Sequence, residues 1–423
     1  MKNTNKESEF QRGWRTLAAA SLGNAAGLSG LAFYTFGVFV IPLTAAFGWT
    51  RGEISSAASF LTLGTAITAP LVGTLIDRIG ARKVALWSLL GLALAYAAMT
   101  QLAGTIGVFY AAWLAIALIG GGTTPVVWTR TVNLWFDRSR GLALGLTLAG
   151  SGLAGMFGPV FCAALIERFG WQAGYLGVGA LIAFVAIPVV ALLLKERPAP
   201  RQASVADGGA DDLAGLTFQE AVRTGTYWKI AGGFLLVSGA IAGLIINIVP
   251  LLQDRGMSPL QAAQIAGSMG IAVMLGRVIV GLLLDRFSAR LVAGVMLSST
   301  ALGCLAMSLS GAPTWVLMLS VVSLGFAAAA EVDLVAFLVS RYFGMKAYGK
   351  IYGSQLTAFY LGAAAGPLLM GLSYDHFGGY TEILYAVAAI LVFGAIVLAT
   401  LGTPPDNSTT SAVEPQLTEQ QAG

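Results

Sequence analysis

Three ionisable residues fall inside long apolar stretches of this chain, where an ionised side chain is costly and marks a functional site. Arg277 is the only cation among them, and Glu331 and Asp333 are the only acids. Arginine stays protonated and presents a planar fork of donors that matches a carboxylate. We therefore expect Arg277 to bind a substrate carboxylate, with a structural ion pair to Glu331 or Asp333 as the alternative.

Glu331 and Asp333 are two residues apart, so on a helix they point to nearly opposite sides and cannot both face one cavity. One of them is a candidate proton-coupling residue, because burial favours the neutral form of a carboxyl group. The other is expected to pair with a basic residue such as Arg341. The spacing leaves open which residue takes which role.

Polar side chains at mid-membrane depth require hydrogen-bond partners. Tyr34, Asn247 and Gln355 are such residues, and each is a candidate substrate contact, with a hydrogen bond between helices as the alternative. Helical spacing places Tyr352, Gln355 and Phe359 on one face, where they would flank a small acid.

The elements that must position these residues are membrane spans. Apolar residues make up 57% of the 423-residue chain and charged residues 10%, against about 25% charged in a soluble protein. A membrane-spanning helix needs about 20 apolar residues, and the sequence offers twelve candidates. They lie near residues 14–41, 54–76, 83–102, 106–129, 140–166, 173–194, 228–253, 259–284, 290–310, 313–340, 349–374 and 380–402.

The chain repeats itself with an offset of 208 residues, which predicts a duplicated unit with six spans in each copy. GTLIDRIGAR, from Gly73, returns as GLLLDRFSAR, from Gly281, and Glu167 to Gly170 maps onto Asp375 to Gly378. In both copies an acid at a helix end is followed by basic residues. We expect these loops to latch the two halves together while that side is shut, with ordinary positive-inside charge as the alternative. The candidate gating residues are Gly73, Asp77, Arg78, Arg82, Lys83, Asp285, Arg286, Arg138 and Arg140.

Charge predicts the orientation. With both termini cytoplasmic, the inside segments hold all of the 24 Lys and Arg residues except Arg51, Arg168, Arg255 and the intrahelical Arg277, as the positive-inside rule requires. The net charge of +4 therefore reflects the membrane topology and does not indicate nucleic-acid binding. The polar start leads directly into a helix too long for a cleavable signal peptide. We expect a multi-pass protein of a bacterial-type inner membrane.

Glycines mark two features of the first half. Six of them, from Gly141 to Gly158, recur along the fifth span, where they favour either tight static packing or a surface on which the halves rock. Gly120 to Pro125 puts three glycines before a proline, which predicts a hinge or a kink in the fourth span.

Neither cysteines nor histidine suggest a cofactor or metal. Cys162 and Cys304 fall inside predicted spans and are expected to be small packing residues. The single histidine, His376, is placed in an outside loop and leaves a haem or zinc centre without ligands.

The predicted domains are an N-terminal six-helix bundle (1–194), a cytoplasmic linker (195–227), a C-terminal six-helix bundle (228–402) and a disordered cytoplasmic tail (403–423). Within the linker, Thr217 and Glu220 have the spacing of a capping box, which predicts a short interfacial helix before the seventh span.

GTLIDRIGARK resembles the loop signature between the second and third helices of the major facilitator superfamily, and its second copy strengthens the likeness. The stretch LWFDRSRGLALGLTLAG, from Leu134, is similar to the signature that leads into the fifth helix of monocarboxylate transporters, and oxalate:formate antiporters share much of it. The resemblance implies an all-α fold of twelve helices in two bundles. It also supports Arg277 as the carboxylate-binding residue, because these transporters carry an arginine in the eighth helix.

Three departures qualify this resemblance. Animal monocarboxylate transporters pair that arginine with an aspartate one turn earlier, where this chain has Val273, and they use a lysine in the first helix, which is absent here. Oxalate transporters have a second cation where Gln355 stands, so a monoanion is favoured over a dianion.

The resulting expectation is a secondary transporter, not an enzyme, that moves a small organic monocarboxylate by alternating access, with proton symport or anion exchange as the driving step. The alternative is an exporter of drugs or of neutral or cationic metabolites. A non-transporting sensor or scaffold is disfavoured because neither tail holds a soluble domain, and a nucleotide-driven pump because no phosphate-binding loop is present.

Overall fold

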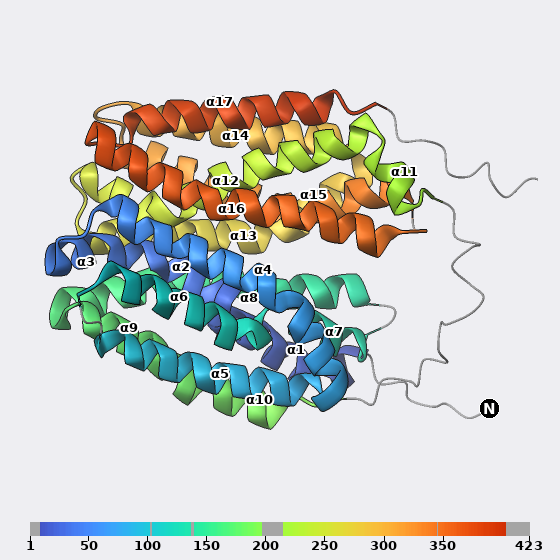
Figure 1. Cartoon of the computed structure of the whole chain (residues 1–423), viewed down its shortest axis with the longest axis horizontal. Coiled ribbons are helices and arrows are strands. Elements are labelled where there is room, and N and C mark those ends of the chain that lie inside the picture. The colour runs from blue at the N-terminus through green and yellow to red at the C-terminus, as the bar shows by residue number, and fades with distance from the viewer. Residues whose placement is uncertain (1–8, 102–103, 137–138, 197–214, 345, 403–423) are drawn as a thin grey trace, which may run out of the picture.

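The computed structural model describes residues 9–101, 104–136, 139–196, 215–344 and 346–402, and these residues fold almost entirely into helices (Figure 1). The predicted tail, 403–423, and most of the predicted linker, 197–214, lie outside the described residues. Within the described residues, eleven helical stretches are long and apolar enough to cross a membrane. The helix α4, Arg51–Ile79, has 29 residues and occupies the place predicted for the second span, which completes the set of twelve.

The first six spans form one bundle. Their helices are α1 (Glu9–Ala26), α2 (Phe33–Thr35), α3 (Val40–Phe47), α4, α5 (Ala81–Ala98), α6 (Ile106–Gly120), α7 (Pro125–Asn133), α8 (Arg140–Phe169), α9 (Trp171–Leu181) and α10 (Ile187–Leu193). Short π or 3-10 segments interrupt three of these spans, as in Leu28–Ala32, Gly121–Thr123 and Ile182–Ala186.

The last six spans form the second bundle, and each is one continuous helix. They are α12 (Gly225–Asp254), α13 (Pro259–Arg286), α14 (Ala289–Ser308), α15 (Thr314–Phe343), α16 (Tyr348–Phe377) and α17 (Thr381–Ala399). In Figure 1 this bundle lies above the first. The start of α1, the end of α17 and the short α11 (Phe218–Val222) share one end of the molecule, here named the linker end; the opposite end is the far end.

The first span differs from the single helix expected over 14–41. It breaks at Gly27, which is extended with ψ −167°, and at Gly30, whose φ and ψ of −109° and −107° are not helical. The predicted break in the fourth span is confirmed, because Thr124 is extended before Pro125 starts α7. The two breaks meet: the Leu28 backbone N–H donates to Thr123 Oγ1 at 3.1 Å.

Very short turns join neighbouring helices in the two repeated loops: one residue between α4 and α5, and two residues between α13 and α14. Gly80 is the only residue between α4 and α5, and its φ of +91° favours glycine. In the second copy its counterpart, Ser288, keeps a φ of −65° and caps α14 by accepting the Leu291 N–H. The loss of glycine in the second copy therefore reflects a different turn.

The predicted capping box exists. Thr217 Oγ1 accepts the Glu220 N–H at 3.3 Å, and the Glu220 carboxylate accepts the Thr217 N–H at 2.8 Å. The resulting helix α11 is fixed to the second bundle, because the Leu216 N–H donates to the Phe343 carbonyl at 2.8 Å.

The bundles meet along two helix pairs, α8 with α13 and α4 with α16. Glycines bring the first pair into backbone contact: a Cβ on Gly270 would lie 2.1 Å from the Met156 nitrogen and 2.3 Å from the Gly152 carbonyl oxygen. The glycine run of the fifth span thus forms part of the bundle boundary. Cys162 and Cys304 are both free and buried, as expected of packing residues, whereas His376 lies in the last turn of α16 and not in a loop.

Candidate functional site

The three ionisable residues of the predicted spans come together where α13 lies against α15. Arg277 Nη1 is 3.8 Å from Asp333 Oδ1, a long ion pair whose side chains are 16% and 37% exposed. Arg277 Nε and Glu331 Oε2 are buried and have no hydrogen-bond partner among the described residues. A guanidinium with a spare N–H beside two carboxylates can bind an anion or exchange one carboxylate partner for another.

Both acids interact with Arg277, although their spacing predicts that only one faces it. Electrostatic interactions link Arg277 to Glu331 and to Asp333, but only Asp333 is within ion-pair distance. Arg341 does not pair with either acid in the described part of the chain; its guanidinium lies 5.4 Å from the ring centre of Phe337. That predicted pairing is wrong because Arg341 is two helical turns beyond Asp333, at the linker end.

Tyr34 brings the first bundle to this site. It interacts electrostatically with Arg277 and Glu331, and its ring carbon Cδ1 lies 3.2 Å from the Cβ position of Gly155 in α8. Tyr34 sits in α2, directly after the break in the first span, and its ring is perpendicular to that of Phe33, at 89° and 5.7 Å between centres. The break therefore determines where Tyr34 meets the second bundle.

An apolar cluster lies next to the ionisable residues. Phe359, which is 8% exposed, packs with Ala242 and Ala363, and Phe33, Val332 and Tyr360 pack against them. Val332 lies between the two acids in sequence, so the cluster adjoins the charged group directly. Together, Tyr34, Arg277, Glu331, Asp333 and Phe359 define the central site, an aromatic and charged junction of both bundles.

Asn247 and Gln355 lie elsewhere. Asn247 is fully buried, and its Oδ1 accepts hydrogen bonds from Ser55 Oγ at 3.1 Å and from the Tyr380 hydroxyl at 3.3 Å, towards the far end. Gln355 is also fully buried, and its Nε2 donates to the Tyr227 carbonyl of α12 at 3.2 Å. Each of these side chains therefore forms hydrogen bonds between helices, which was the expected alternative to a substrate contact.

Polar contacts close the far end between the bundles. Arg51, in the first turn of α4, donates two hydrogen bonds of 2.7 Å to Asp254 at the end of α12. Its guanidinium carbon lies 3.9 Å from the Tyr374 ring centre. Beside it the Gly52 N–H donates to Asp375 Oδ2 at 2.9 Å. The sequence identified Arg51 only as an outside cation, because nothing in sequence links it to a partner 203 residues away.

The described inter-bundle hydrogen bonds all involve residues 51–59 of α4, so the far end is the closed end. At the linker end, Cβ atoms on the predicted gating residue Gly73 and on Gly145 and Gly353 would meet nothing within 4 Å. The α4, α8 and α16 surfaces that carry these glycines therefore have free space around them. The structure thus corresponds to a state in which the two bundles are separated at the linker end and joined at the far end.

The other predicted gating residues have varied surroundings. Arg82 Nη2 donates to the Ala191 carbonyl of its own bundle, and Arg78, Lys83 and Arg286 are exposed. The side chains of Asp77, Asp285 and Arg140 and the whole of Arg138 lie outside the described residues. The latch between the bundles stays a prediction, because it forms only when this end is shut.

Comparison with known proteins gives the same picture of the fold. The family model described as Major Facilitator Superfamily matches residues 22–288 and 230–420. A bacterial homolog of the human lysosomal transporter Spinster, solved in an inward-facing and unoccupied conformation, superimposes with a TM-score of 0.70 at 18% identity, over 93% of this chain and 97% of that one.

Monocarboxylate transporters are among the curated relatives of this chain. Monocarboxylate transporter 13 of Bos taurus is 27% identical over 404 residues, which cover 92% of this chain and 89% of that protein. Monocarboxylate transporter 11 of Homo sapiens is 25% identical over 303 residues, covering 68% of this chain and 61% of that protein.

Proposed function

Since the chain belongs to the major facilitator superfamily and is a multi-pass membrane transporter, we propose that it moves a small organic monocarboxylate anion by alternating access. The observation that carries the proposal is the Arg277 guanidinium, which keeps an unpartnered Nε next to Tyr34 and the Phe359 cluster. The names of the monocarboxylate transporter relatives support the same substrate class.

The site favours one carboxylate and a short apolar body. Arg277 is the only cation deep in a predicted span, so it matches a single negative charge. The Tyr34 hydroxyl supplies a second donor, and the Phe359 cluster receives the apolar part. Asn247 and Gln355 are left out of the substrate contacts, because the protein already uses their polar groups.

Substrate binding and proton binding are coupled because Arg277 exchanges one ion-pair partner, Asp333, for another, the substrate. A substrate carboxylate that binds Arg277 replaces the carboxylate of Asp333, which is held at only 3.8 Å. Asp333 then takes up a proton, because an unpaired carboxylate is costly inside the membrane. The pair re-forms when substrate and proton leave. Glu331, with Oε2 unpartnered, is the second candidate for that proton. In the anion-exchange variant, a second anion displaces the first and neither acid is protonated.

Two gates alternate around the central site. The Arg51–Asp254 pair and its neighbours close the far end. The repeated loops with Gly73, Asp77, Asp285 and Arg286 close the linker end in the opposite state, together with the other predicted gating residues. We place the linker end and both termini in the cytoplasm of a cell with this protein in its inner membrane, as the distribution of Lys and Arg favours.

The test is uptake of labelled short-chain monocarboxylates into proteoliposomes, with and without an imposed pH gradient. We expect Arg277→Ala and Arg277→Lys to reduce uptake by at least about tenfold, because the guanidinium is the substrate's charge partner and its planar fork has no lysine equivalent. Arg223→Gln, which removes an exposed cation from the end of α11, is the control and keeps wild-type uptake. Unchanged uptake in both Arg277 variants would remove the carboxylate assignment.

The Arg277–Asp333 pair also supports a second candidate, an exporter of drugs or of neutral or cationic metabolites. In that case Asp333 neutralises Arg277 permanently and Glu331 faces the substrate. A thermal-shift panel separates the candidates: monocarboxylates raise the unfolding temperature of the first kind of protein, whereas only neutral or cationic compounds raise that of the second.

A further inference from the structure

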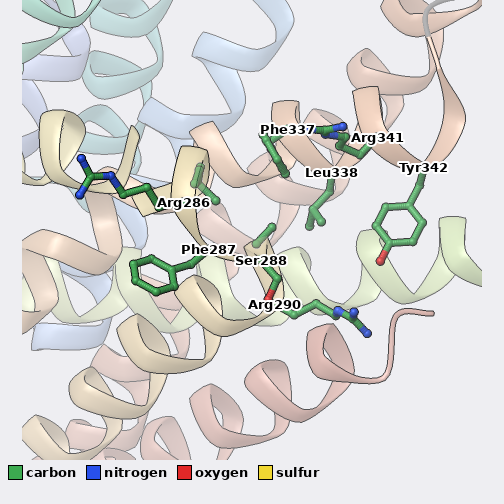
Figure 2. Close-up of a pocket in the computed structure, with 10 residues that line it drawn as sticks. Arg286, Phe287, Ser288, Arg290, Phe337, Leu338, Arg341 and Tyr342 are labelled. Carbon is green, nitrogen blue, oxygen red and sulfur yellow. The ribbon is translucent and has the colours of Figure 1, made fainter. Parts of the chain in front are cut away.

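A pocket of about 290 Å³ opens at the linker end of the second bundle, and none of its lining residues belongs to the central site (Figure 2). It lies between the end of α13, the start of α14 and the last turns of α15. This volume is at the small end of ligand pockets and fits a head group better than a drug-sized molecule. Its lining residues are Leu284, Arg286, Phe287, Ser288, Ala289, Arg290, Phe337, Leu338, Arg341 and Tyr342.

Three arginines line this pocket, and within the described residues none of them pairs with a carboxylate. Arg290 Nη1 donates to the Leu401 carbonyl at 2.9 Å, and Arg341 lies over the Phe337 ring at 5.4 Å. Arg286 is exposed. Figure 2 shows Arg341 on one side of the pocket, Arg290 across from it, and Arg286 extending in the other direction. Arg341 and Arg290 therefore lie on opposite sides of the hollow without a carboxylate partner among the described residues, and two such positive charges create a site for an anion.

The first turn of α14 adds uncharged donors to the same hollow. Ser288 caps this 20-residue helix and lies in the pocket wall together with Ala289 and Arg290. Ser288 already accepts the Leu291 N–H, so the backbone N–H groups of Ala289 and Arg290 are the ones without a partner within the helix, and they point towards its N-terminus. They favour a phosphate over a carboxylate, because a phosphate offers more acceptor oxygens to guanidinium and backbone donors together.

An apolar stripe leads from the pocket along the outer surface of α14. Phe287, Leu291 and Val295 are spaced four residues apart and are 51%, 54% and 55% exposed. On a membrane span such a stripe is covered by acyl chains. The arginines thus lie where the head groups of the bilayer end and the acyl chains begin, which distinguishes this pocket from a site for a soluble anion.

We propose that this pocket binds the phosphate of an anionic phospholipid, with Arg341, Arg290 and the α14 amino terminus around the phosphate and the acyl chains along Phe287, Leu291 and Val295. The pocket belongs to one bundle only, so a lipid can occupy it whichever end of the transporter is open. This is a lipid site in addition to the substrate site and does not depend on which substrate is transported.

The test is a lipid titration of the delipidated full chain in detergent, with binding followed by native mass spectrometry and by the unfolding temperature. The probes are phosphatidylglycerol, phosphatidylcholine with the same acyl chains, and inorganic phosphate. We expect phosphatidylglycerol to bind at least about fivefold more tightly than phosphatidylcholine, since one cation near an anionic lipid contributes roughly that factor. Inorganic phosphate alone is expected to produce no shift at the same concentrations.

Variants locate the site. Arg341→Gln is expected to weaken phosphatidylglycerol binding about fivefold, Arg341→Lys to retain most of it, and the matched control Arg223→Gln to leave it unchanged. The unfolding temperature without lipid verifies that each variant is folded, and the comparison of lipids on the wild-type chain needs no variant. Equal binding of the two lipids, wild-type binding by Arg341→Gln, or phosphate binding as tightly as the lipid would each overturn the proposal.

Discussion

Arg51 and Asp254 join the two bundles through two parallel hydrogen bonds of 2.7 Å each, and their side chains are only 12% and 31% exposed. The geometry is the planar fork of a guanidinium on a carboxylate, the strongest form of ion pair between side chains. Because α4 and α12 belong to different bundles, this pair exists only while the far end is shut. It therefore biases the balance between the two states of the transporter.

Arg51→Ala is expected to open the far end. The loss of a partly buried pair is worth about 1 kcal/mol, which shifts the population towards the far-end-open state roughly fivefold. The reporter is Ser59→Cys, whose native hydroxyl donates to the Ala364 carbonyl across the bundle boundary. Labelling of this cysteine by a membrane-impermeant maleimide should be faster with Arg51→Ala than in Ser59→Cys alone. Asp254→Ala should act in the same way, and the double variant should add little.

Asp333→Asn is expected to separate proton coupling from substrate binding. The neutral amide no longer competes with the substrate for Arg277 and no longer carries a proton. Uptake of a monocarboxylate should then lose its stimulation by an inward pH gradient, whereas exchange of internal for external monocarboxylate continues. Glu331→Gln is the companion variant. If it abolishes the stimulation and Asp333→Asn does not, Glu331 is the proton carrier.

Gly270→Ala is expected to destabilise the contact between α8 and α13. The new methyl group would lie 2.1 Å from a backbone nitrogen, so the helices must move apart. Overpacking of this kind costs about 1–3 kcal/mol, which should lower the unfolding temperature and slow transport. Gly294→Ala is the matched control, because a Cβ at this glycine of α14 meets nothing within 4 Å. Equal unfolding temperatures for the two variants would contradict the close contact.

The capping box predicts that the stability of helix α11, which lies outside the predicted membrane spans, depends on pH. A hydrogen bond from the Thr217 backbone N–H lowers the pKa of Glu220. A carboxyl group whose pKa is lower in the folded state than in the unfolded state stabilises the folded state. This stabilisation is complete above the unfolded-state pKa and is lost as the pH falls through the folded-state pKa. Amide protection of residues 217–222, corrected for the intrinsic rate, should thus fall between pH 7 and about pH 3. Glu220→Gln should remove this dependence.

Local sequence signals predicted the elements that depend on local interactions. The twelve spans follow from apolar length, the break before Pro125 from a missing backbone donor, and α11 from the spacing of Thr217 and Glu220. The family resemblance was confirmed by the match over residues 22–288 and 230–420.

Interactions between the two bundles could not be predicted from the sequence. Asn247 looked like a polar residue available to substrate, but its partner Ser55 is 192 residues away. The break at Gly27 was also missed, because glycines continue an unbroken helix elsewhere, as Gly152 does in α8. What distinguishes Gly27 is its tertiary neighbour: a Cβ there would lie 2.5 Å from the Thr123 carbonyl oxygen.

The interrupted spans of the first bundle have a mechanical consequence. Because each break removes helical hydrogen bonds, we expect the first bundle to bend more readily than the second, whose described helices α12–α17 are continuous. The break at Thr123 corresponds, 208 residues on, to Glu331 in the unbroken α15. The position of a helix break in one copy thus carries, in the other copy, an acidic side chain inside the membrane. Tyr34 belongs to an interrupted span and Arg277 to a continuous helix, so we expect Tyr34 to move more than Arg277 between the two states of the transporter.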